Sequence, residues 1–480
     1  MLQARKAAGS LIERSDLDCI EMAAERLAAQ IAAGAPPTGV YGFLDEKRPD
    51  GSPYFAISFA ELPISKPTLS GLLRAQYTTM TPVQRGTIPH ALCGRDILGT
   101  AVTGSGKTLA FLIPALECLY RERWSSMDGL GVLILEPARE LAIQVFETLR
   151  AVGRKHNFSA GLVIGGKDVA VEKKKVAGMN ILVATPGRLL QHFLETPYFS
   201  ADNLQMLVID EADRVLDMGF EETVNSILEY LPRKRQSLLF SATLGKSIQT
   251  LAKLSLREPE YINFLARETG EDTIGTPLKL NQHYTVVELD RKLDLLFSFL
   301  RSHTKSKILI FLSSCKQVRF TYEALKLLHP GVPLMELHGK QKQTKRTAVF
   351  FSFLERTEAA MVATDIAARG LDFPAVDWVV QMDCPEDVQS YIHRVGRTAR
   401  YKSKGNSLLF LLPTELPFLT SLEARAIPIK QVTIKAKKTV SIKPALHSFV
   451  AADPELKHLA EKSLISYARS VFLMPNKASC

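Results

Sequence analysis

The chain has 480 residues and a net charge of +10, which allows about two or three domains and favours a polyanionic partner. No apolar run approaches the roughly 18 residues that cross a bilayer, and no long apolar segment follows the N-terminus, which argues against a membrane or secreted protein. The six cysteines show neither metal-ligand nor disulfide spacing and are expected to be reduced packing residues.

The first predicted element is an amphipathic helix in an N-terminal extension, residues 1–54. Its apolar residues alternate at three- and four-residue spacing, at Leu17, Ile20, Ala24, Leu27 and Ile31. Two heptads are too few for a coiled coil, and a helix docked on the rest of the protein is an equally good interpretation. Gly34 to Pro37 end the pattern, and the stretch from Pro36 to Pro53 is expected to be a linker.

Residues 55–265 are predicted to form one α/β domain. Apolar, strand-like runs alternate there with helical patterns, which is typical of a parallel sheet flanked by helices. The expected strands are 97–98, 132–135, 160–164, 181–183, 206–209 and 237–240. Residues 266–279 break the pattern and are expected to be an interdomain linker.

The segment from Ala101 to Thr108 has the pattern of a phosphate-binding loop between a strand and a helix. Gly104 and Gly106 allow backbone N–H groups to surround phosphates. Lys107 supplies a positive charge, and the Thr108 hydroxyl can bind magnesium. Ala101 stands where the general pattern has glycine, so this segment alone is an incomplete signal.

Asp210 and Glu211 follow the apolar strand 206–209, which places them at the carboxyl edge of a parallel sheet, where nucleotide sites lie. Asp210 can hold Mg²⁺, and Glu211 can orient water. An isolated acidic run after a strand is more often a solvated face. Together, however, this run and the phosphate loop predict a nucleoside triphosphatase.

A second α/β domain is expected at 280–415, followed by a small basic appendage at 416–480. Its expected strands are 307–311, 334–337, 360–363, 376–380 and 407–411. This domain has no phosphate loop. Arg397 and Arg400 are three residues apart, so on a helix they would share one face and could reach one phosphate group across a cleft. Because an arginine finger accelerates hydrolysis by about 10³–10⁵, the second domain is a candidate switch.

In this order the motifs resemble those of the DEAD-box RNA helicases of superfamily 2, over residues 59–412. The matching segments are Phe59, 81–84, 103–108, 137–142, 165–166, 185–188, 210–213, 241–243, 309–311, 338–339 with Gln343 and Arg346, 363–372 and 393–400. The resemblance implies an α/β fold of two tandem RecA-like domains. It also implies that ATP is the fuel and that Mg²⁺ is the cofactor.

For the ATP site, the resemblance implies that Phe59 stacks on the adenine, Gln84 hydrogen-bonds its edge and Asp372 contacts the ribose. The phosphates and magnesium would be held by Thr103, Gly104, Ser105, Gly106, Lys107 and Thr108. Asp210 would bind the metal through water, and Glu211 would activate the attacking water. The charge of the transition state would be neutralised by Arg397 and Arg400.

The resemblance also implies which residues couple the domains and which bind RNA. The coupling residues would be Asp213, Ser241, Thr243, Gln343 and His393. RNA would lie across both domains, in contact with Arg139, Gly166, Thr185, Arg188, Arg346 and Thr364. Amides, hydroxyls and arginines suit phosphates and sugars, which positions a strand without reading its sequence, so a preference for RNA would come from the 2′-hydroxyls.

Three positions depart from the family pattern. Ala138 stands where threonine is usual, which removes one hydroxyl from the RNA side, and Gln76 and Met80 replace the usual glycine and proline before Gln84. Within the family, residues 235–243, 369–376 and 466–474 look most like the nucleolar subgroup that acts in small-subunit ribosome biogenesis. That likeness implies a monomeric protein of the nucleus and nucleolus, without a membrane, whose partners are pre-rRNA or small nucleolar RNA and pre-ribosomal proteins.

Two other functions use similar motifs. An ATP-gated RNA clamp would hold strands instead of separating them, and its site would be identical to that of a helicase. A DNA translocase fits less well, because the adenine-reading segment and the run from Asp210 to Asp213 occur together in RNA enzymes.

Overall fold

The structure is a computed structural model that describes residues 58–101, 104–166, 168–242, 246–263, 280–365, 376–398, 405–433 and 439–473. The chain divides into two compact units, Met1–Arg267 and Glu268–Cys480. The helix predicted within residues 1–54 and the linker predicted at 266–279 lie outside the described residues. Within the described ranges, no helix is both long and apolar enough to cross a membrane.

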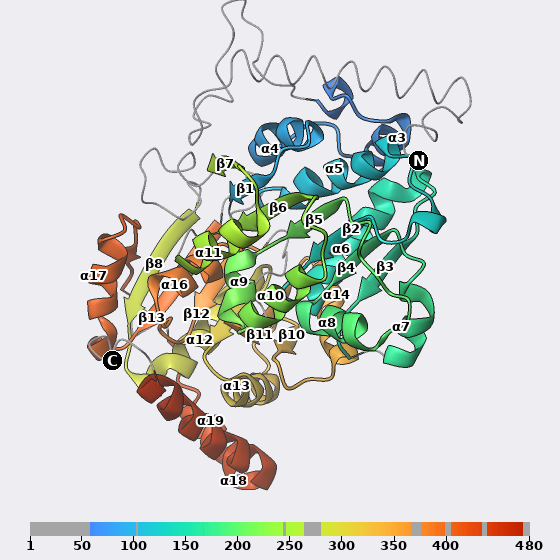
Figure 1. The fold of residues 1–480 in the computed structure, drawn as a ribbon. Coiled ribbons are helices and arrows are strands. Elements are labelled where there is room, and N and C mark those ends of the chain that lie inside the picture. The colour runs from blue at the N-terminus through green and yellow to red at the C-terminus, as the bar shows by residue number, and fades with distance from the viewer. Residues whose placement is uncertain are drawn as a thin grey trace, which may run out of the picture. The chain divides into compact units, whose positions relative to one another are not determined.

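The first unit contains a parallel sheet of seven strands in the order β3-β4-β2-β5-β6-β1-β7 (Figure 1). The strands are β1 (Ile97–Thr100), β2 (Val132–Leu135), β3 (Ala160–Val163), β4 (Ile181–Ala184), β5 (Met206–Ile209), β6 (Gln236–Ser241) and β7 (Glu260–Asn263). Side chains of β2 alternate between two core clusters, with Ile134 in one and Leu133 in the other. This two-residue period shows that both faces of the sheet are covered and confirms the predicted α/β class.

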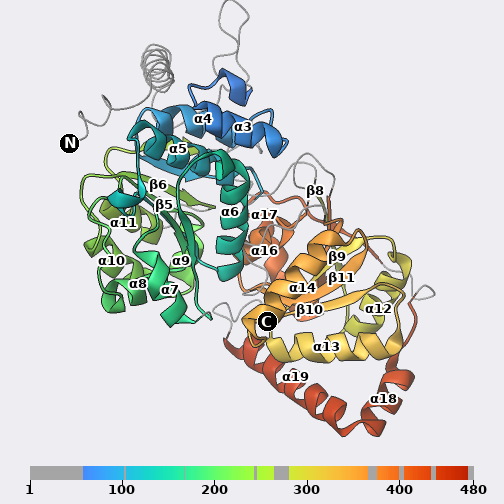
Figure 2. The ribbon, with the colours of Figure 1, turned by 90° about the vertical axis from the view of Figure 1, so that its right-hand side faces the viewer.

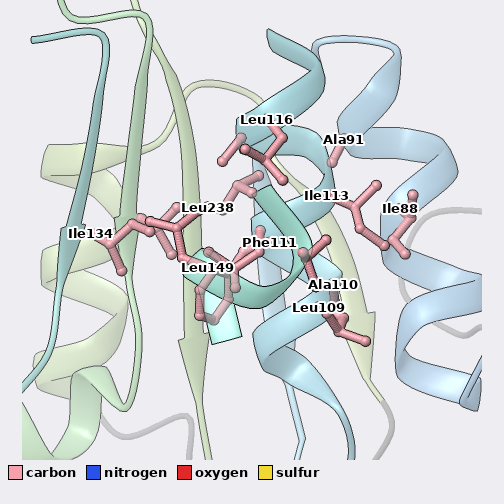
Figure 3. Close-up of a cluster of buried hydrophobic side chains, with 14 of the residues drawn as sticks. Ile88, Ala91, Leu109, Ala110, Phe111, Ile113, Leu116, Ile134, Leu149 and Leu238 are labelled. Carbon is pink, nitrogen blue, oxygen red and sulfur yellow. The ribbon is translucent and has the colours of Figure 1, made fainter. Parts of the chain in front are cut away.

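Helices cover the two faces of this sheet. They are α3 (Lys66–Arg74), α4 (Pro82–Leu92), α5 (Lys107–Arg121), α6 (Arg139–Val152), α7 (Val169–Val176), α8 (Pro186–Glu195), α9 (Ala212–Asp217), α10 (Glu221–Glu229) and α11 (Lys246–Ser255), with short 3-10 turns η1 (Phe59–Glu61), η2 (Ser126–Asp128) and η3 (Gly153–Lys155). Helices α4, α5 and α6 supply one cluster, and α8 to α11 supply the other. Figure 3 shows side chains of α4 and α5, including Ile88 and Phe111, gathered with Leu238 of β6 in the first cluster.

The second unit repeats this plan with a parallel sheet in the order β10-β11-β9-β12-β13-β8-β14. Its strands are β8 (Leu280–Val286), β9 (Lys307–Leu312), β10 (Leu334–Leu337), β11 (Ala359–Thr364), β12 (Trp378–Gln381), β13 (Gly405–Leu411) and β14 (Lys430–Gln431). Its helices are α12 (Lys292–Ser302), α13 (Cys315–Leu328), α14 (Gln343–Glu355), α16 (Val388–Val395), α17 (Pro417–Glu423), α18 (Lys443–Ala452) and α19 (Pro454–Leu473), with turns η4 (Leu289–Arg291) and η5 (Pro413–Glu415). The two sheets confirm the prediction of two tandem RecA-like domains.

The last helix, α19, packs along α13 of the same unit (Figure 2). The hydroxyl oxygens of Ser314 and Ser466 lie 2.7 Å apart and join the two helices. The ammonium of Lys292 also lies over the ring of Tyr467, 5.9 Å from its centre. Helix α19 is therefore attached to the second sheet domain through α13 and α12.

Candidate active site

The phosphate loop leads from β1 into the first turn of α5. Gly104 and Gly106 have φ angles of 79° and 95°, in the left-handed region that favours glycine. A Cβ atom on Gly106 would lie 2.7 Å from the Nε2 atom of Gln84 and 2.8 Å from the Oγ1 atom of Thr81. The loop therefore requires glycine there for conformation and for space, and it places the positive end of the α5 dipole beside Lys107.

Lys107 is buried at the start of α5, and its Nζ atom lies 3.6 Å from the Oδ1 atom of Asp210. No described residue forms a hydrogen bond with this ammonium. Burial acts to lower the pKa of Lys107, but the carboxyl groups of Asp210, Glu211 and their neighbours raise it. A charged, buried ammonium without a hydrogen-bond acceptor is suited to a phosphate group.

Asp210 is the first residue after β5, and its N–H donates to the carbonyl oxygen of Leu135 on β2 over 3.1 Å. Its Oδ1 atom also accepts a 2.8 Å hydrogen bond from the N–H of Glu211. Burial raises the pKa of Asp210; the charge of Lys107 opposes the shift and that of Glu211 adds to it. Asp210 thus places a carboxyl group beside the phosphate loop. A divalent cation bound there would add its positive charge to that of Lys107.

Glu211 adopts a left-handed backbone, with φ 46° and ψ 51°, immediately before α9. This conformation is strained for a residue with a side chain, and such strain is concentrated at functional sites. The Oε2 atom of Glu211 lies 3.9 Å from an Nη1 atom of Arg214, one turn along α9.

Asp213 connects the acidic run to the end of β6. Its Oδ2 atom accepts a 3.2 Å hydrogen bond from the N–H of Ala242, the residue after Ser241. Burial, and then the charge of Glu211, raise the pKa of Asp213 to about 6. The predicted coupling residues Asp213 and Ser241 therefore lie on adjoining segments, while Thr243 lies outside the described residues.

Glu136 was not predicted from the sequence, yet it follows β2 as Asp210 follows the neighbouring β5. It is fully buried, and neither of its carboxyl oxygens has a hydrogen-bond partner among the described residues. Burial and the charges of Asp210 and Glu211 raise its pKa well above the ordinary value. The signal was available, because an acidic residue directly after a fully apolar strand is the same pattern that identified Asp210.

On the predicted adenine side, Gln84 lies in the first turn of α4. Its Oε1 atom accepts a hydrogen bond from the N–H of Thr81 over 2.8 Å, and its Nε2 atom donates to the carbonyl oxygen of Gly106 over 2.9 Å. Gln84 thus joins α4 to the phosphate loop. Phe59 is 1% exposed and packs in the core cluster with α4 and α5, and its stacking role stays a prediction.

The predicted RNA residues of the first unit follow the carboxyl ends of β2, β3 and β4. Arg139 begins α6 after β2, Gly166 has a φ of 88° after β3, and Thr185 precedes α8 after β4. In α8, an Nη1 atom of Arg188 lies 3.3 Å from the Oε2 atom of Glu172. Because all strands are parallel, these residues share one sheet edge with Lys107 and Asp210. Along this edge, the predicted RNA residues follow β3, β4 and β2, and the nucleotide residues lie at β5, β6 and β1.

In the second unit, α16 ends at Val395, and the N–H of the next residue, Gly396, donates to the carbonyl oxygens of Ile392 and Arg394. Arg397 lies beyond this helix, and a shared face with Arg400 stays a prediction. Its Nε atom donates to the carbonyl oxygen of His393 over 3.1 Å. Arg400, Thr103 and Asp372 lie outside the described residues.

Arg394 has a structural position that the sequence analysis did not predict. Its Nε and Nη2 atoms donate to the two carboxylate oxygens of Asp365 over 2.7 and 2.6 Å, and Nη1 donates to the carbonyl oxygen of Asp383 over 2.8 Å. This fork fixes α16 to the end of β11.

The other predicted residues of the second unit lie on β11 and α14. Thr364 is the last residue of β11, and Arg346 lies in α14. Gln343 begins α14, but its side chain is not among the described ones.

Comparison with known proteins places these motifs in a family. Residues 81–251 match the DEAD/DEAH box helicase model, and residues 291–402 match the helicase conserved C-terminal domain. The chain is 57% identical over 427 residues to the ATP-dependent RNA helicase DBP4 of Mycosarcoma maydis, covering 89% of this chain and 46% of that protein. It is 56% identical over 421 residues to dbp4 of Aspergillus fumigatus, covering 88% and 53%. The chain thus spans about half the length of the curated relatives it matches.

A solved structure has a similar fold. Mss116p bound to single-stranded RNA and AMP-PNP matches with a TM-score of 0.75 and 29% identity, covering 85% of each chain. That structure thus shows RNA and a nucleotide analogue bound to a protein whose fold is similar to the fold of this chain.

Proposed function

The chain belongs to the DEAD/DEAH box helicase family, and from that membership we propose that it is an ATP-dependent RNA helicase. It would hydrolyse ATP to separate or remodel short RNA duplexes locally, without moving far along a strand. The observation that carries this proposal is the buried pair of Lys107 and Asp210 at the end of the phosphate loop. The names of the similar fungal proteins, ATP-dependent RNA helicases, support it.

The phosphates of ATP would bind to the backbone of the loop and to the ammonium of Lys107. Magnesium fits the same place, because the Asp210 carboxyl group is buried beside Lys107 and Thr108 follows Lys107 in the first turn of α5. Asp210, through water, and the Thr108 hydroxyl would hold the ion. Bound magnesium would neutralise phosphate charge and polarise the terminal phosphoryl group. Glu211 would orient the attacking water and accept its proton.

Arg397 and Arg400 belong to the second unit, and Lys107 belongs to the first. We propose that hydrolysis is fast only when residues of both units act on one nucleotide. ATP and RNA would then each favour the same closed form, so that each ligand raises the affinity of the other by the same factor. Asp213, Ser241, Thr243, Gln343 and His393 would couple this closure to the separation of RNA strands.

RNA would bind through its backbone. Loop amides at Gly166, the hydroxyl of Thr185 and the guanidinium groups of Arg139 and Arg188 lie on one sheet edge, and Arg346 and Thr364 would extend the contact in the second unit. Such groups bind phosphates and sugars in any sequence. The net charge of +10 supports attraction of a polyanion.

The likeness to the DBP4 helicases and the nucleolar character of residues 235–243, 369–376 and 466–474 support a role in small-subunit ribosome biogenesis. The partners would be pre-rRNA or small nucleolar RNA and pre-ribosomal proteins, in the nucleolus. Crosslinking of the chain to RNA in cells tests this role. Recovery of messenger RNA alone, without pre-rRNA or small nucleolar RNA, would contradict it.

The activity is tested by ATP hydrolysis and by release of a labelled strand, each with RNA and with DNA of one sequence. RNA should stimulate hydrolysis and DNA should not. Arg397→Ala should bind ATP nearly as the unchanged chain does but hydrolyse it about 10³-fold more slowly. Hydrolysis without strand release would favour the clamp, and equal stimulation by DNA would favour the translocase.

A further inference from the structure

A cavity of about 740 Å³ lies in the first unit, away from the candidate active site. Its lining includes Ala160 and Ile181, which are the first residues of β3 and β4, and the last turns of α3 and α6. Because the strands are parallel, this is the amino edge of the sheet, whereas Lys107 and Asp210 lie at the carboxyl edge. The cavity therefore has no part in the nucleotide or RNA contacts proposed above.

The cavity combines an apolar floor with a basic rim. Leu116, Leu149 and Ile181 are buried in the floor, whereas Arg74 and Arg154 are exposed at the rim. A third rim arginine, Arg150, is bonded to Glu147, the one acidic residue of the lining, over 3.1 and 3.2 Å. Neither Arg74 nor Arg154 has an ion pair with another residue in the described part of the chain. Two positive charges therefore border an apolar surface without compensation.

The walls of the cavity are held in place by their own contacts. His156 stacks on Phe158 with ring centres 5.1 Å apart, and its Nε2 atom lies 2.8 Å from the Oγ1 atom of Thr68 in α3. Helix α3 also packs against α6 and η3. Figure 2 shows α3 above α6 at this side of the sheet. A pocket whose lining mixes apolar side chains with arginines suits a ligand that carries both acidic and apolar groups.

The chain itself contains a segment of this chemistry, at residues 11–31, which lie outside the described residues. The segment has five acidic and two basic residues, Glu13, Asp16, Asp18, Glu21 and Glu25 against Arg14 and Arg26, so its net charge is −3. On a helical projection, Asp16 and Glu21 border the apolar face formed by Leu17, Ile20 and their successors, Glu13 falls within that face, and Asp18, Glu25 and Arg26 lie opposite. An acidic border round an apolar stripe complements a basic rim round an apolar floor.

The connection between the two is short enough to favour their contact. Twenty-six residues (32–57) lie between the segment and Ser58, and a chain of that length can reach at most roughly 85–95 Å when fully extended. The described chain continues from Ser58 through η1 into α3, whose last residue, Arg74, is part of the rim. Because the segment and the cavity belong to one chain, their association is intramolecular, which favours even a weak docking interaction.

We propose that residues 11–31 dock as an amphipathic helix in this cavity of the first unit, with Leu17 and Ile20 on the apolar floor and Asp16 and Glu21 against Arg74 and Arg154. The docked segment covers the amino edge of the sheet and leaves the carboxyl edge open to nucleotide and RNA. The proposal does not depend on the enzymatic activity, because it concerns residues that the proposed site does not use.

Amide hydrogen exchange of the full chain, read by mass spectrometry, tests this docking with four forms of the protein. They are the unchanged chain, the rim variant Arg74→Glu/Arg154→Glu, the segment variant Asp16→Lys/Glu21→Lys, and the chain with all four substitutions. Residues 11–31 should be protected in the unchanged chain and lose about fivefold of that protection in either double variant. Protection should return in the fourfold variant, because the charges are complementary again.

Several outcomes would overturn the proposal. Exchange of residues 11–31 that is the same in all four forms, or protection that survives reversal of the rim charges, would mean that the segment is not in this cavity. Protection that grows with protein concentration would assign the contact to a second copy of the chain. If the rim variant instead lost affinity for RNA while residues 11–31 were unprotected in every form, the arginines would belong to a nucleic-acid surface. Thermal unfolding of each variant separates these results from misfolding, and Leu17→Asp supplies a second variant that leaves the rim unchanged.

Discussion

The ammonium of Lys107 lies 3.6 Å from the carboxylate of Asp210, and both side chains are buried. The first group begins α5 and the second follows β5, so residues about a hundred positions apart in the chain form one ion pair. The pair shows how the phosphate loop and the acidic run depend on each other.

Replacement of Lys107 by alanine should reduce ATP hydrolysis at least about 100-fold, because it removes the positive charge that faces the phosphates. It should also destabilise the first unit by about 3–5 kcal/mol, because a buried carboxylate loses its cation. Hydrolysis assays and urea unfolding measure the two effects. Lys253→Ala, in an exposed position on α11, is the control and should change neither; a normal rate in the Lys107 variant would exclude its phosphate role.

Glu211→Gln should keep nucleotide affinity but lose turnover by about 10² to 10⁴, because an amide cannot accept the proton of the attacking water. The variant should accumulate bound to ATP and RNA, which a filter-binding assay with labelled nucleotide detects. Glu221→Gln, at the exposed start of α10, provides a carboxylate control. Normal turnover in Glu211→Gln would assign the base to another residue.

Gly106→Ala should weaken nucleotide binding, because the added Cβ atom would lie 2.7 Å from the Nε2 atom of Gln84 and would displace the loop. Gly94 is a matched control, since its φ of 78° is also left-handed but no atom lies within 4 Å of the added Cβ. Both variants should lose about 1 kcal/mol of stability from the backbone strain. Only Gly106→Ala should lose affinity in a titration with a fluorescent nucleotide, and equal losses would show that strain alone is responsible.

The raised pKa of Asp213 leads us to expect that the stability of the folded chain depends on pH. Burial, and then the charge of Glu211, raise its pKa from 3.8 to about 6 in the folded chain, so the folded state binds the proton more tightly than the unfolded state. The stabilisation is therefore fully present below pH 4 and is lost as the pH rises through about 6, with a magnitude on the order of 2–3 kcal/mol.

The Asp213→Asn variant should lack this dependence. Urea unfolding at intervals between pH 4 and pH 8 gives the difference in unfolding free energy between the two chains, which should shift in favour of the variant as the pH rises. A difference that is constant across this range would show that Asp213 has an ordinary pKa in the folded protein.

Arg188→Ala should weaken RNA binding equally for different sequences and lower the salt dependence of binding by about one phosphate contact, a change of roughly 0.7 in slope for a single strand. The measurement is RNA affinity at several salt concentrations in the presence of a non-hydrolysable ATP analogue. Arg233→Ala, an exposed position on the same unit, should leave the slope unchanged. A loss of affinity with an unchanged slope would mean that Arg188 supports the fold and not the phosphate contact.

The sequence predicted the central strands well. Each of them is a run of apolar residues only, which is typical of a strand that is buried on both faces. Val132–Leu135 and Met206–Ile209 have the predicted bounds. The edge strand β7 and the polar strand β8 were not predicted, since Asn281, Gln282 and His283 interrupt the apolar pattern of β8. Pairing of β8 with β13 along seven residues is a long-range effect that a local pattern does not contain.

For the candidate site, residue types and spacing predicted that Lys107 and Asp210 lie at one sheet edge. The same pattern, an acidic residue after an apolar strand, was available for Glu136, whereas its place beside Asp210 depends on the register of β2 against β5. The left-handed turn at Glu211 and the fork between Arg394 and Asp365 also depend on tertiary neighbours. Local spacing did not show that α16 ends at Val395, before Arg397.

The parallel strands of the first unit give its sheet two chemically different ends, with Lys107 and Asp210 at one and the arginine-rimmed cavity at the other. A molecule bound in that cavity would not collide with ATP or RNA. If such a molecule changed the rate, its effect would be noncompetitive toward both substrates, because it would displace neither of them. Control of this kind would persist at saturating ATP, when an inhibitor of the phosphate loop would already have been displaced.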